Sequence, residues 1–374
     1  MVKKEGMKIL ITGASGFIGS FLCEEGLKRG METWAGMREH SSRRWLQQER
    51  LNFAFLDLTD ADRLRTGLAK YKEKVGRWDV IVHAAGATKC LHREDFFLHN
   101  YDCTRNLVNT LDELDMLPEQ FLYVSSLSVL GPIGEEMNAD GTYNDMTADD
   151  TPQPNTAYGE SKVRSEQWLK ELGMRNEELG MIANHPDREA IPHSSSPISH
   201  SFNYTIFRPT GVYGPREKDY FMMAKSIKQH IDFAVGYKRQ VLTFVYVRDL
   251  VSAIFAAIGK NEVANGKTYL VSDGHNYDSR AFSDLIQKEL GVKGVLHIKA
   301  PLWLLRVISG VAEWFSHLTG KPSTLNGDKY RIMCQRNWQC DISPIRRDLG
   351  FEPEWPLERG VKECMQWYKD NKWL

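Results

Sequence analysis

The chain has few cysteines and no surplus of charge. Its 374 residues include 6 cysteines, at positions 23, 90, 103, 334, 340 and 364, with no CxxC pair and no His/Cys pattern at structural-zinc spacing. Lysines and arginines total 48 against 49 aspartates and glutamates, a net charge of −1. The cysteine usage fits a reducing compartment, and we expect no metal site and no nucleic-acid partner, because nucleic acids are bound by basic surfaces.

The chain also lacks a secretory signal and an uninterrupted membrane-spanning run. Its N-terminus, MVKKEGMKILITG, passes from two lysines straight into a strand-like stretch. The most apolar later stretch, residues 301–318, is interrupted by Arg306, Glu313 and His317. Its apolar residues recur at helical spacing: Leu302, Leu305, Ile308, Val311, Ala312 and Phe315. We predict a cytoplasmic protein in which this helix packs on protein; an interfacial helix lying on a membrane is the less favoured alternative.

The chain does contain enough apolar sequence, 42% of its residues, for a large core. Its length suggests two units, or one large α/β domain with an added lobe. Short apolar runs alternate with longer helical stretches in the first half, which predicts a doubly wound parallel sheet with crossover helices. The expected strands are 8–12, 33–38, 52–56, 80–83, 121–125 and 205–207.

The alternation loosens beyond residue 214, although a strand and helix in 242–258 and a strand at 267–271 are expected to return to the sheet. The rest would form a smaller, more helical lobe over the carboxyl edge of the sheet, where ligands bind. The expected division is 1–211 with 241–275 for the core, and 212–240 with 276–374 for the substrate lobe.

A polar stretch between residues 173 and 203 has no usable period and predicts an exposed excursion. It contains His185, His193 and His200. Without acidic residues at ligand spacing, we interpret these as solvated loop histidines.

A glycine-rich turn, TGASGFIG, joins the first expected strand to a helix. Gly13, Gly16 and Gly19 permit a tight turn, close approach of the backbone to a pyrophosphate, and close packing of helix on strand. The anion would sit on the helix N-terminus, where we also expect Phe17 and Ile18 to contact it. This position between strand and helix predicts a dinucleotide site.

The end of the second expected strand favours NADP over NAD. An acidic residue there would bind the adenosine ribose of NAD, but the stretch reads ETWAGMREHSSRR, with Met37 in that place and Arg38 next. Ser41, Arg43 and Arg44 follow closely. A basic residue would pair with the 2′-phosphate of NADP. The alternative is that these arginines only solvate a loop, in which case NAD remains possible.

Two further strand ends are expected to contact the cofactor. Asp57, in FLDLTD, could accept a hydrogen bond from the adenine amino group, with Leu58 beside it. Ala84, Ala85 and Gly86 are small residues after the fourth strand and would let the cofactor's backbone pass close.

The motifs TGASGFIG, DLTD, HAAG, VSSLSVLG, YGESK and RPTGVYGP stand in the order and approximate spacing of the extended short-chain dehydrogenase/reductase family. The chain resembles this family over nearly its whole length. The resemblance implies a Rossmann core, a Ser-Tyr-Lys site and a C-terminal substrate lobe. It also implies that Lys162 reaches the nicotinamide ribose, and that a homodimer is possible, since such pairing is common in the family.

The chemistry of Tyr158 and Lys162 suits hydride transfer. Reduction of a carbonyl needs a proton donor for the developing alkoxide, and oxidation needs a base. A phenol can do both, and an ammonium one helical turn later is expected to favour the phenolate. In the family the catalytic serine stands five residues before the glycine of the VYG-like motif, which identifies Ser126 as the residue that holds the substrate oxygen; Ser125 and Ser128 are rivals.

Three residues complete the expected cofactor site. Asn100 matches the asparagine of the family's helix behind the site, with a helix-surface amide as the alternative interpretation. Pro209 and Val212 follow the sixth strand and would line the nicotinamide through backbone contacts.

Two departures from the family's sugar-nucleotide enzymes bear on the substrate. Gly211 replaces the asparagine of RPxNVYGP, and Leu242 replaces the arginine that pairs with diphosphate. Arg216, Arg239 or Arg248 could supply that charge instead.

The C-terminal segment is similar to the 3β-hydroxysteroid dehydrogenase-like branch. Its aromatic residues, Trp303, Trp314 and Trp338, suit an apolar pocket, or else merely fill the lobe's own core. We predict an NAD(P)-dependent oxidoreductase that interconverts a secondary alcohol and a ketone on a fairly apolar, steroid-like small molecule. The alternatives are a nucleotide-sugar epimerase or dehydratase, and a non-catalytic cofactor-sensing protein.

Overall fold

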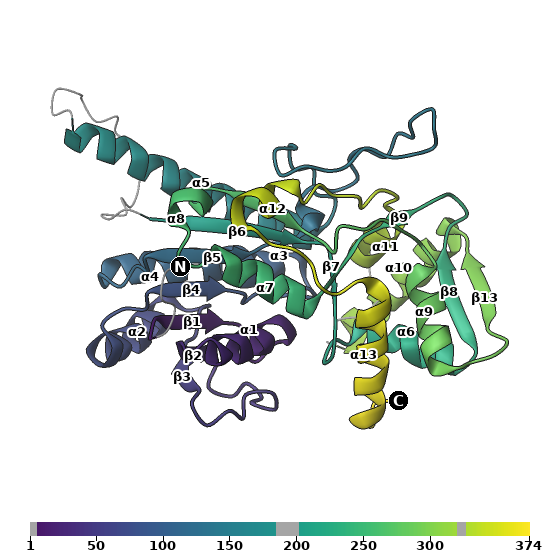
Figure 1. The fold of residues 1–374 in the computed structure, drawn as a ribbon, viewed down its shortest axis with the longest axis horizontal. Helices are drawn as coiled ribbons and strands as arrows, with labels where there is room; N and C mark the ends of the chain where they lie inside the picture. Colours follow the sequence, from purple (N-terminus) through teal and green to yellow (C-terminus); the bar gives the residue numbers. More distant parts are fainter. Residues whose placement is uncertain (1–5, 185–201, 320–326) are drawn as a thin grey trace.

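The computed structural model describes residues 6–184, 202–319 and 327–374 (Figure 1). Its centre is a seven-stranded sheet in the order β11-β6-β5-β4-β1-β2-β3, with every neighbouring pair parallel. The strands are β1 (Lys8–Thr12), β2 (Glu32–Met37), β3 (Asn52–Phe55), β4 (Val80–His83), β5 (Gln120–Val124), β6 (Tyr204–Pro209) and β11 (Thr268–Val271). This confirms the predicted doubly wound sheet, with the strand expected at 267–271 as its seventh member.

Helices cover both faces of the sheet, which explains why the strands are continuous apolar runs. Ile9 and Ile11 of β1 pack on one side, and Leu10 between them packs on the other, because successive side chains of a strand point to opposite faces. The helices on the first side include α1 (Phe17–Lys28) and α7 (Val247–Ala257); those on the second include α2 (Ala61–Val75), α4 (Cys103–Glu113) and α5 (Ala157–Asn184).

Helix α5 is longer than the sequence predicted. It continues past residue 173, where the excursion was expected to begin. Gly173 does not end the helix: a Cβ there would lie 2.5 Å from the Tyr204 ring, so glycine lets the helix lie close to β6. The predicted loop histidines at 185, 193 and 200 lie outside the described residues.

A second group of elements lies beside the core and is mostly helical (Figure 1). Three short strand pairs belong to it: β7 (Gly211–Tyr213) with β10 (Phe244–Tyr246), β9 (Val241–Leu242) with β12 (Tyr277–Asp278), and β8 (Ile231–Val235) with β13 (Leu296–Ala300). Its helices are α6 (Asp219–Lys228), α9 (Ala281–Leu290), α10 (Leu302–Thr319), α11 (Gly327–Cys334) and α13 (Leu357–Asp370). By contrast, α12 (Ser343–Leu349) packs against α7, α8 (Asn261–Ala264) and β11 of the core.

The predicted packing of α10 on protein is wrong for much of its apolar face. Leu305 is buried, but Leu302, Ile308 and Val311 are exposed. Trp303 is exposed too, so this tryptophan does not fill the lobe's core. None of the helices in the described residues has the length and apolarity needed to span a bilayer. The described residues also contain no cluster of three potential metal ligands from His, Cys, Asp and Glu.

Candidate active site

The turn between β1 and α1 is packed too closely for side chains. Gly13 has φ of +68°, and a Cβ there would lie 2.8 Å from the Ala84 carbonyl oxygen and from Cα of Ala85. A Cβ on Gly19 would overlap the Gly13 carbonyl. At Gly16 a Cβ would lie 3.1 Å from the same carbonyl oxygen. The turn therefore presents bare backbone, as close approach to a pyrophosphate requires.

Helix α1 starts at this turn with its first amides available to an anion. Gly16 is the N-cap residue in extended backbone, and no side chain of the described residues caps it. The first turn, which begins with Phe17 and Ile18, carries no acidic residue. Because the first N–H groups of a helix have no partner within the helix, this end can hold a phosphate group.

Arg38 is the one arginine of its stretch that remains at the end of β2 without an aromatic contact among the described residues. It is exposed there. The guanidinium of Arg43 lies 4.7 Å from the Phe53 ring centroid, and that of Arg44 lies 4.5 Å from the Trp45 ring centroid. These two arginines stack on aromatic rings, so Arg38 is the best placed of the three for a ribose phosphate.

Asp57 follows β3 as an ionised hydrogen-bond acceptor. One carboxylate oxygen accepts from the Thr59 hydroxyl at 2.6 Å, and the other accepts from Arg63 at 3.5 Å. The hydrogen bond from Thr59 holds the pKa of Asp57 below its usual value. The Leu58 carbonyl accepts from the Asn106 amide at 3.1 Å, which fixes this strand end against α4.

Tyr158 and Ser126 come together at the carboxyl ends of the strands, close enough for the Ser126 hydroxyl to lower the pKa of the phenol. Tyr158 lies in the first turn of α5, and Ser126 follows β5. The Ser128 hydroxyl donates to Ser126 at 2.9 Å. Ser125 instead donates to the buried Glu166 at 2.5 Å. Of the three candidate serines, Ser126 is therefore the one positioned to act with Tyr158.

Lys162 is buried on the next turn of α5. Its ammonium donates to the Val124 carbonyl at 2.9 Å and lies 4.8 Å from the Tyr123 ring centroid. A Cβ on Gly86 would lie 3.3 Å from this ammonium and 2.6 Å from the Asn100 amide oxygen. The absence of a side chain at Gly86 therefore makes room for both groups.

Burial governs the protonation of both catalytic candidates. It raises the pKa of Tyr158 to about 12, while the hydrogen bond with Ser126 acts in the lowering direction. Burial also lowers the pKa of Lys162 to about 8, against the opposing influence of Glu166. The sequence predicted that Lys162 favours the Tyr158 phenolate. This stays a prediction: burial is the largest influence on the pKa of Tyr158, and a phenol with a pKa of about 12 carries its proton at neutral pH.

Asn100 is a buried structural link rather than a helix-surface amide. It lies in a π-helical turn, η1 (Phe97–Asp102), and π-helical turns are frequent at functional sites. Its amide oxygen accepts from the Ala87 N–H at 2.9 Å, and its amide nitrogen donates to Ser161 at 2.9 Å. Asn100 thus ties the loop after β4 to the helix that carries Tyr158 and Lys162.

Pro209 and Val212 lie where β6 ends. Pro209 pairs with Val271 of β11, and Val212 pairs with Val245 of β10. The chain leaves the sheet between them, next to the strand that precedes Ser126.

Sequence reasoning missed two residues that support this site. His83, fully buried, contacts the Thr12 hydroxyl at 2.7 Å, and its pKa is lowered to about 3 by burial and then by the Lys162 charge. The Asp328 carboxylate accepts from the N–H groups of Ala157 at 2.9 Å and Tyr158 at 3.4 Å. No local signal could have identified Asp328, because its partners are 170 residues or more away in the chain.

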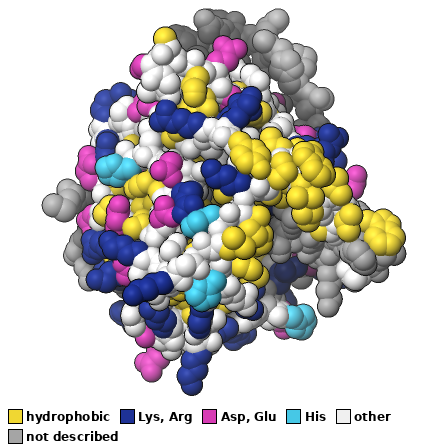
Figure 2. Space-filling model, turned by 90° about the vertical axis from the view of Figure 1, so that its right-hand side faces the viewer, with side chains coloured by type: hydrophobic (Ala, Val, Ile, Leu, Met, Phe, Trp, Pro, Cys, Tyr) yellow, Lys and Arg dark blue, Asp and Glu magenta, His cyan; other side chains and the backbone are white. Residues whose placement is uncertain are grey.

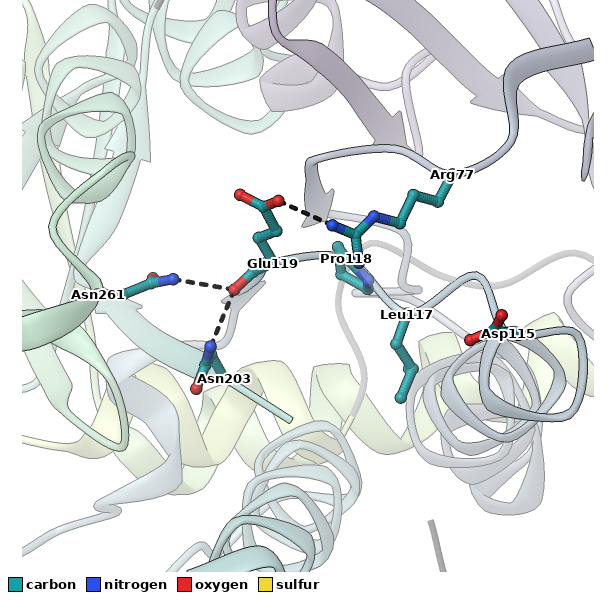
Figure 3. Close-up of a pocket in the computed structure, with 7 residues that line it drawn as sticks. All are labelled: Arg77, Asp115, Leu117, Pro118, Glu119, Asn203 and Asn261. Atoms are coloured by element: carbon teal, nitrogen blue, oxygen red, sulfur yellow. Dashed lines mark hydrogen bonds and ion pairs between the residues drawn. The ribbon is translucent and has the colours of Figure 1, made fainter. Parts of the chain in front are cut away.

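A separate cavity lies at the opposite edge of the sheet (Figure 3). It has a volume of about 400 Å³ and is lined by Arg77, Asp115, Leu117, Pro118, Glu119, Asn203 and Asn261. The amides of Asn261 and Asn203 converge on the Glu119 carbonyl, at 2.9 and 3.1 Å. These residues precede β4, β5 and β6, except Asn261, which begins α8, and none of the predicted site residues lines this cavity.

Known proteins resemble this chain over most of its length. The pattern that defines the NAD dependent epimerase/dehydratase family matches residues 9–272. A 3-beta-hydroxysteroid dehydrogenase of Mycolicibacterium neoaurum is 25% identical, over 97% of this chain and 92% of that protein. An uncharacterized UDP-glucose epimerase of Bacillus subtilis is 26% identical, over 95% of this chain and 96% of that protein.

A solved structure shares the fold. The dTDP-glucose 4,6-dehydratase of Bacillus anthracis, in complex with NAD, superposes with a TM-score of 0.69 at 16% identity, covering 98% of each chain. The relatives therefore include enzymes named for steroids and enzymes named for nucleotide sugars, at similar distances from this chain.

Proposed function

The chain belongs to the NAD-dependent epimerase/dehydratase family, and from that premise we propose that it is an NADP-dependent oxidoreductase interconverting a secondary alcohol and a ketone on an apolar, steroid-sized molecule. It is an enzyme of the extended short-chain dehydrogenase/reductase type. The observation that carries the proposal is that Tyr158 and Ser126 come together at the carboxyl edge of the sheet, with the Ser126 hydroxyl acting on the pKa of the phenol.

The segment after β4 connects this pair to the glycine turn. Ala84 and Ala85 touch the turn at Gly13, and Gly86 lies against Lys162. The backbone of the turn and the first amides of α1 would hold the diphosphate, and Arg38 would pair with the 2′-phosphate that distinguishes NADP. When bound, the dinucleotide supplies or accepts the hydride.

The protein's own contribution is the proton. With its pKa raised to about 12, Tyr158 carries its proton at neutral pH and donates it to the alkoxide oxygen during reduction. The Ser126 hydroxyl holds the same oxygen. In the oxidative direction Tyr158 takes the proton back, and the nearby Lys162 ammonium stabilises the phenolate that forms.

Two features favour an apolar substrate over a nucleotide sugar. A Cβ at Gly211 would lie 2.6 Å from the Tyr220 hydroxyl. The Tyr220 phenol therefore occupies the space that an asparagine side chain would need at position 211. Tyr220 in turn stacks on Phe282 at 4.6 Å between ring centroids, within a cluster that includes Tyr213 and Phe244. This cluster gives the lobe an aromatic core next to β7.

The three arginines that could replace the missing diphosphate cation are engaged elsewhere. Arg216 donates to Ser20 at 2.8 Å and to Glu24 at 2.6 Å. Arg248 pairs with Glu363 at 3.1 Å. Arg239 donates to the backbone carbonyl of residue 141. A diphosphate would have to compete with these partners, which weighs against a nucleotide-sugar substrate.

The second candidate is a nucleotide-sugar epimerase or dehydratase, which the similarity to a UDP-glucose epimerase favours. Such an enzyme oxidises and re-reduces its bound intermediate, so the nicotinamide shows no net change. An oxidoreductase changes the nicotinamide once per turnover.

The test supplies purified chain with NADP⁺ and a 3-hydroxysteroid, or with UDP-glucose, and records reduced-nicotinamide absorbance. We expect the absorbance to rise with the steroid and not with UDP-glucose. With the steroid, it should fail to rise in Ser126→Ala. It should rise normally in the matched variant Ser125→Ala, with circular dichroism checking that this variant is folded. Appearance of a UDP-sugar stereoisomer by NMR, with no net absorbance change, would support the second candidate instead.

A further inference from the structure

Helix α10 presents an apolar surface to solvent. Trp303 is 68% exposed, Val307 56%, Val311 51% and Trp314 59%. These positions are spaced by three or four residues, so they form one stripe along the helix. Only the opposite side of the helix is well buried, at Leu305 and Ser309 among its described side chains.

The stripe continues onto the strand pair β8–β13. Phe233 and Ile298 are paired in register and are both exposed, with Leu296 two residues along the same face. The start of α10 touches the end of β8, where a Cβ at Gly236 would lie 3.5 Å from Leu302. Figure 2 shows hydrophobic side chains gathered on this side of the molecule, with lysines and arginines around them.

Exposed cations border this surface. Residues 231–239 and 293–312 contain five lysines and arginines, and all are exposed: Lys238, Arg239, Lys293, Lys299 and Arg306. The same residues include one acid, Asp232, which is buried and is hydrogen-bonded to His297 at 3.0 Å. These two segments are therefore basic although the chain as a whole is nearly neutral; the next acid along α10 is Glu313.

We propose that α10 and the outer face of β8–β13 form a docking surface for an anionic membrane. Aromatic side chains favour the boundary between headgroups and acyl chains, and exposed lysines and arginines are attracted to anionic lipids. The helix lies flat on the bilayer, because it does not have the apolarity to cross it. A second copy of the chain fits less well, since a two-fold interface would place the same cations opposite one another.

The docking surface adjoins the candidate active site. Helix α10 packs against α11, whose Asp328 accepts hydrogen bonds from the start of the Tyr158 helix. A substrate dissolved in the membrane would therefore be near the site on release. This link to substrate delivery rests on the proposed function, whereas membrane binding itself does not.

The test measures co-sedimentation of the full-length chain with vesicles of phosphatidylcholine alone or mixed with phosphatidylglycerol. We expect binding to the mixed vesicles that weakens as salt is raised. The double variant Val307→Asp/Val311→Asp should bind at least about tenfold more weakly. The control Val263→Asp introduces the same type of side chain at an exposed valine on α8 of the core and should bind as the unaltered chain does.

A second variant separates charge from apolar contact. Lys299→Glu/Arg306→Glu should lose about tenfold or more of its affinity for the mixed vesicles at low salt, with circular dichroism unchanged. Equal binding of wild-type chain to both vesicle types would overturn the anionic-membrane assignment. So would a stable dimer in lipid-free solution that Val307→Asp/Val311→Asp converts to monomer, because the surface would then be an interface between copies. Failure of the steroid assay would leave these results unaffected.

Discussion

The parallel sheet and helix α10 place similar apolar sequence in opposite environments. Ile9, Leu10 and Ile11 of β1 are fully buried, whereas Trp303 and Val311 of α10 are more than half exposed. Each central strand is covered on both faces, so its apolar residues have nowhere else to lie. Helix α10 has one covered side, and its remaining apolar residues face outward. The apolar residues of the central strands therefore form the hydrophobic core, whereas the exposed apolar residues of α10 indicate a surface that binds a partner.

Removing the Tyr158 hydroxyl gives the largest expected effect and tests the chemical role of the core. Tyr158→Phe should lower turnover by about 10²–10⁴-fold, because the proton donor is lost while the packing of the ring is kept. Binding of NADPH, followed by its fluorescence, should change little. Tyr71→Phe, on α2 at the other end of the core, should retain turnover; unaltered turnover in Tyr158→Phe would refute the role.

The difference in burial between α7 and α10 can be measured by making the same substitution, isoleucine to alanine, in each helix. Ile254 of α7 is fully buried and Ile308 of α10 is 45% exposed. Ile254→Ala should lower the free energy of unfolding by about 2–5 kcal/mol, through lost burial and an unfilled cavity. Ile308→Ala should change it by less than about 0.5 kcal/mol. Comparable losses in urea unfolding would mean that α10 packs on protein after all.

The core also buries the charged group of Lys162. The effect of this burial on the free energy of unfolding can be measured as a function of pH. Its folded pKa of about 8 lies below the ordinary value of about 10.4, so the unfolded chain holds more protons between these limits. Stability contributed by this group therefore rises with pH across that window, by about 1.4 kcal/mol per pH unit.

The difference in unfolding free energy between wild type and Lys162→Met isolates this contribution from the buried thiols and phenols. It should grow in favour of the wild type from about pH 8 to about pH 10.4 and be level below pH 8. A difference that is flat or falls with pH would show that the ammonium is not buried as described.

Arg38 gives the smallest expected effect and sharpens the cofactor assignment. Arg38→Ala should weaken NADP binding by about 10–100-fold, because a charged hydrogen bond to phosphate is lost, and should leave NAD binding nearly unchanged. Arg43→Ala is the matched control, since that guanidinium stacks on Phe53. Calorimetric titration measures both; equal losses for the two nucleotides would mean that Arg38 does not contact the 2′-phosphate.

The sequence predicted the sheet well because its determinants are local. Glycines at 13 and 19 and continuous apolar strands form patterns that can be recognised within short stretches of sequence, although the packing of Gly13 against Ala84 is long-range. The exposed face of α10 could not be predicted, since helical spacing shows that a helix has an apolar face and not what covers it. The sequence predicted that the helix ends near Gly173, whereas α5 continues past it because this glycine serves close packing on Tyr204.

Within the site, sequence reasoning identified residue types and missed long-range partners. Choosing Ser126 over Ser125 required seeing that Ser125 donates to Glu166. The raised pKa of Tyr158 depends on burial, which no spacing rule supplies. Asp328 reaches the start of α5 from the far end of the chain.

A crystal structure of the chain grown with NADP⁺ tests the central claim most directly. We expect the diphosphate over the first turn of α1, the 2′-phosphate beside Arg38, and the nicotinamide ring within reach of the Tyr158 and Ser126 hydroxyls. A dinucleotide bound in the cavity at the amino edge of the sheet, or a Tyr158 hydroxyl directed away from the ring, would contradict it.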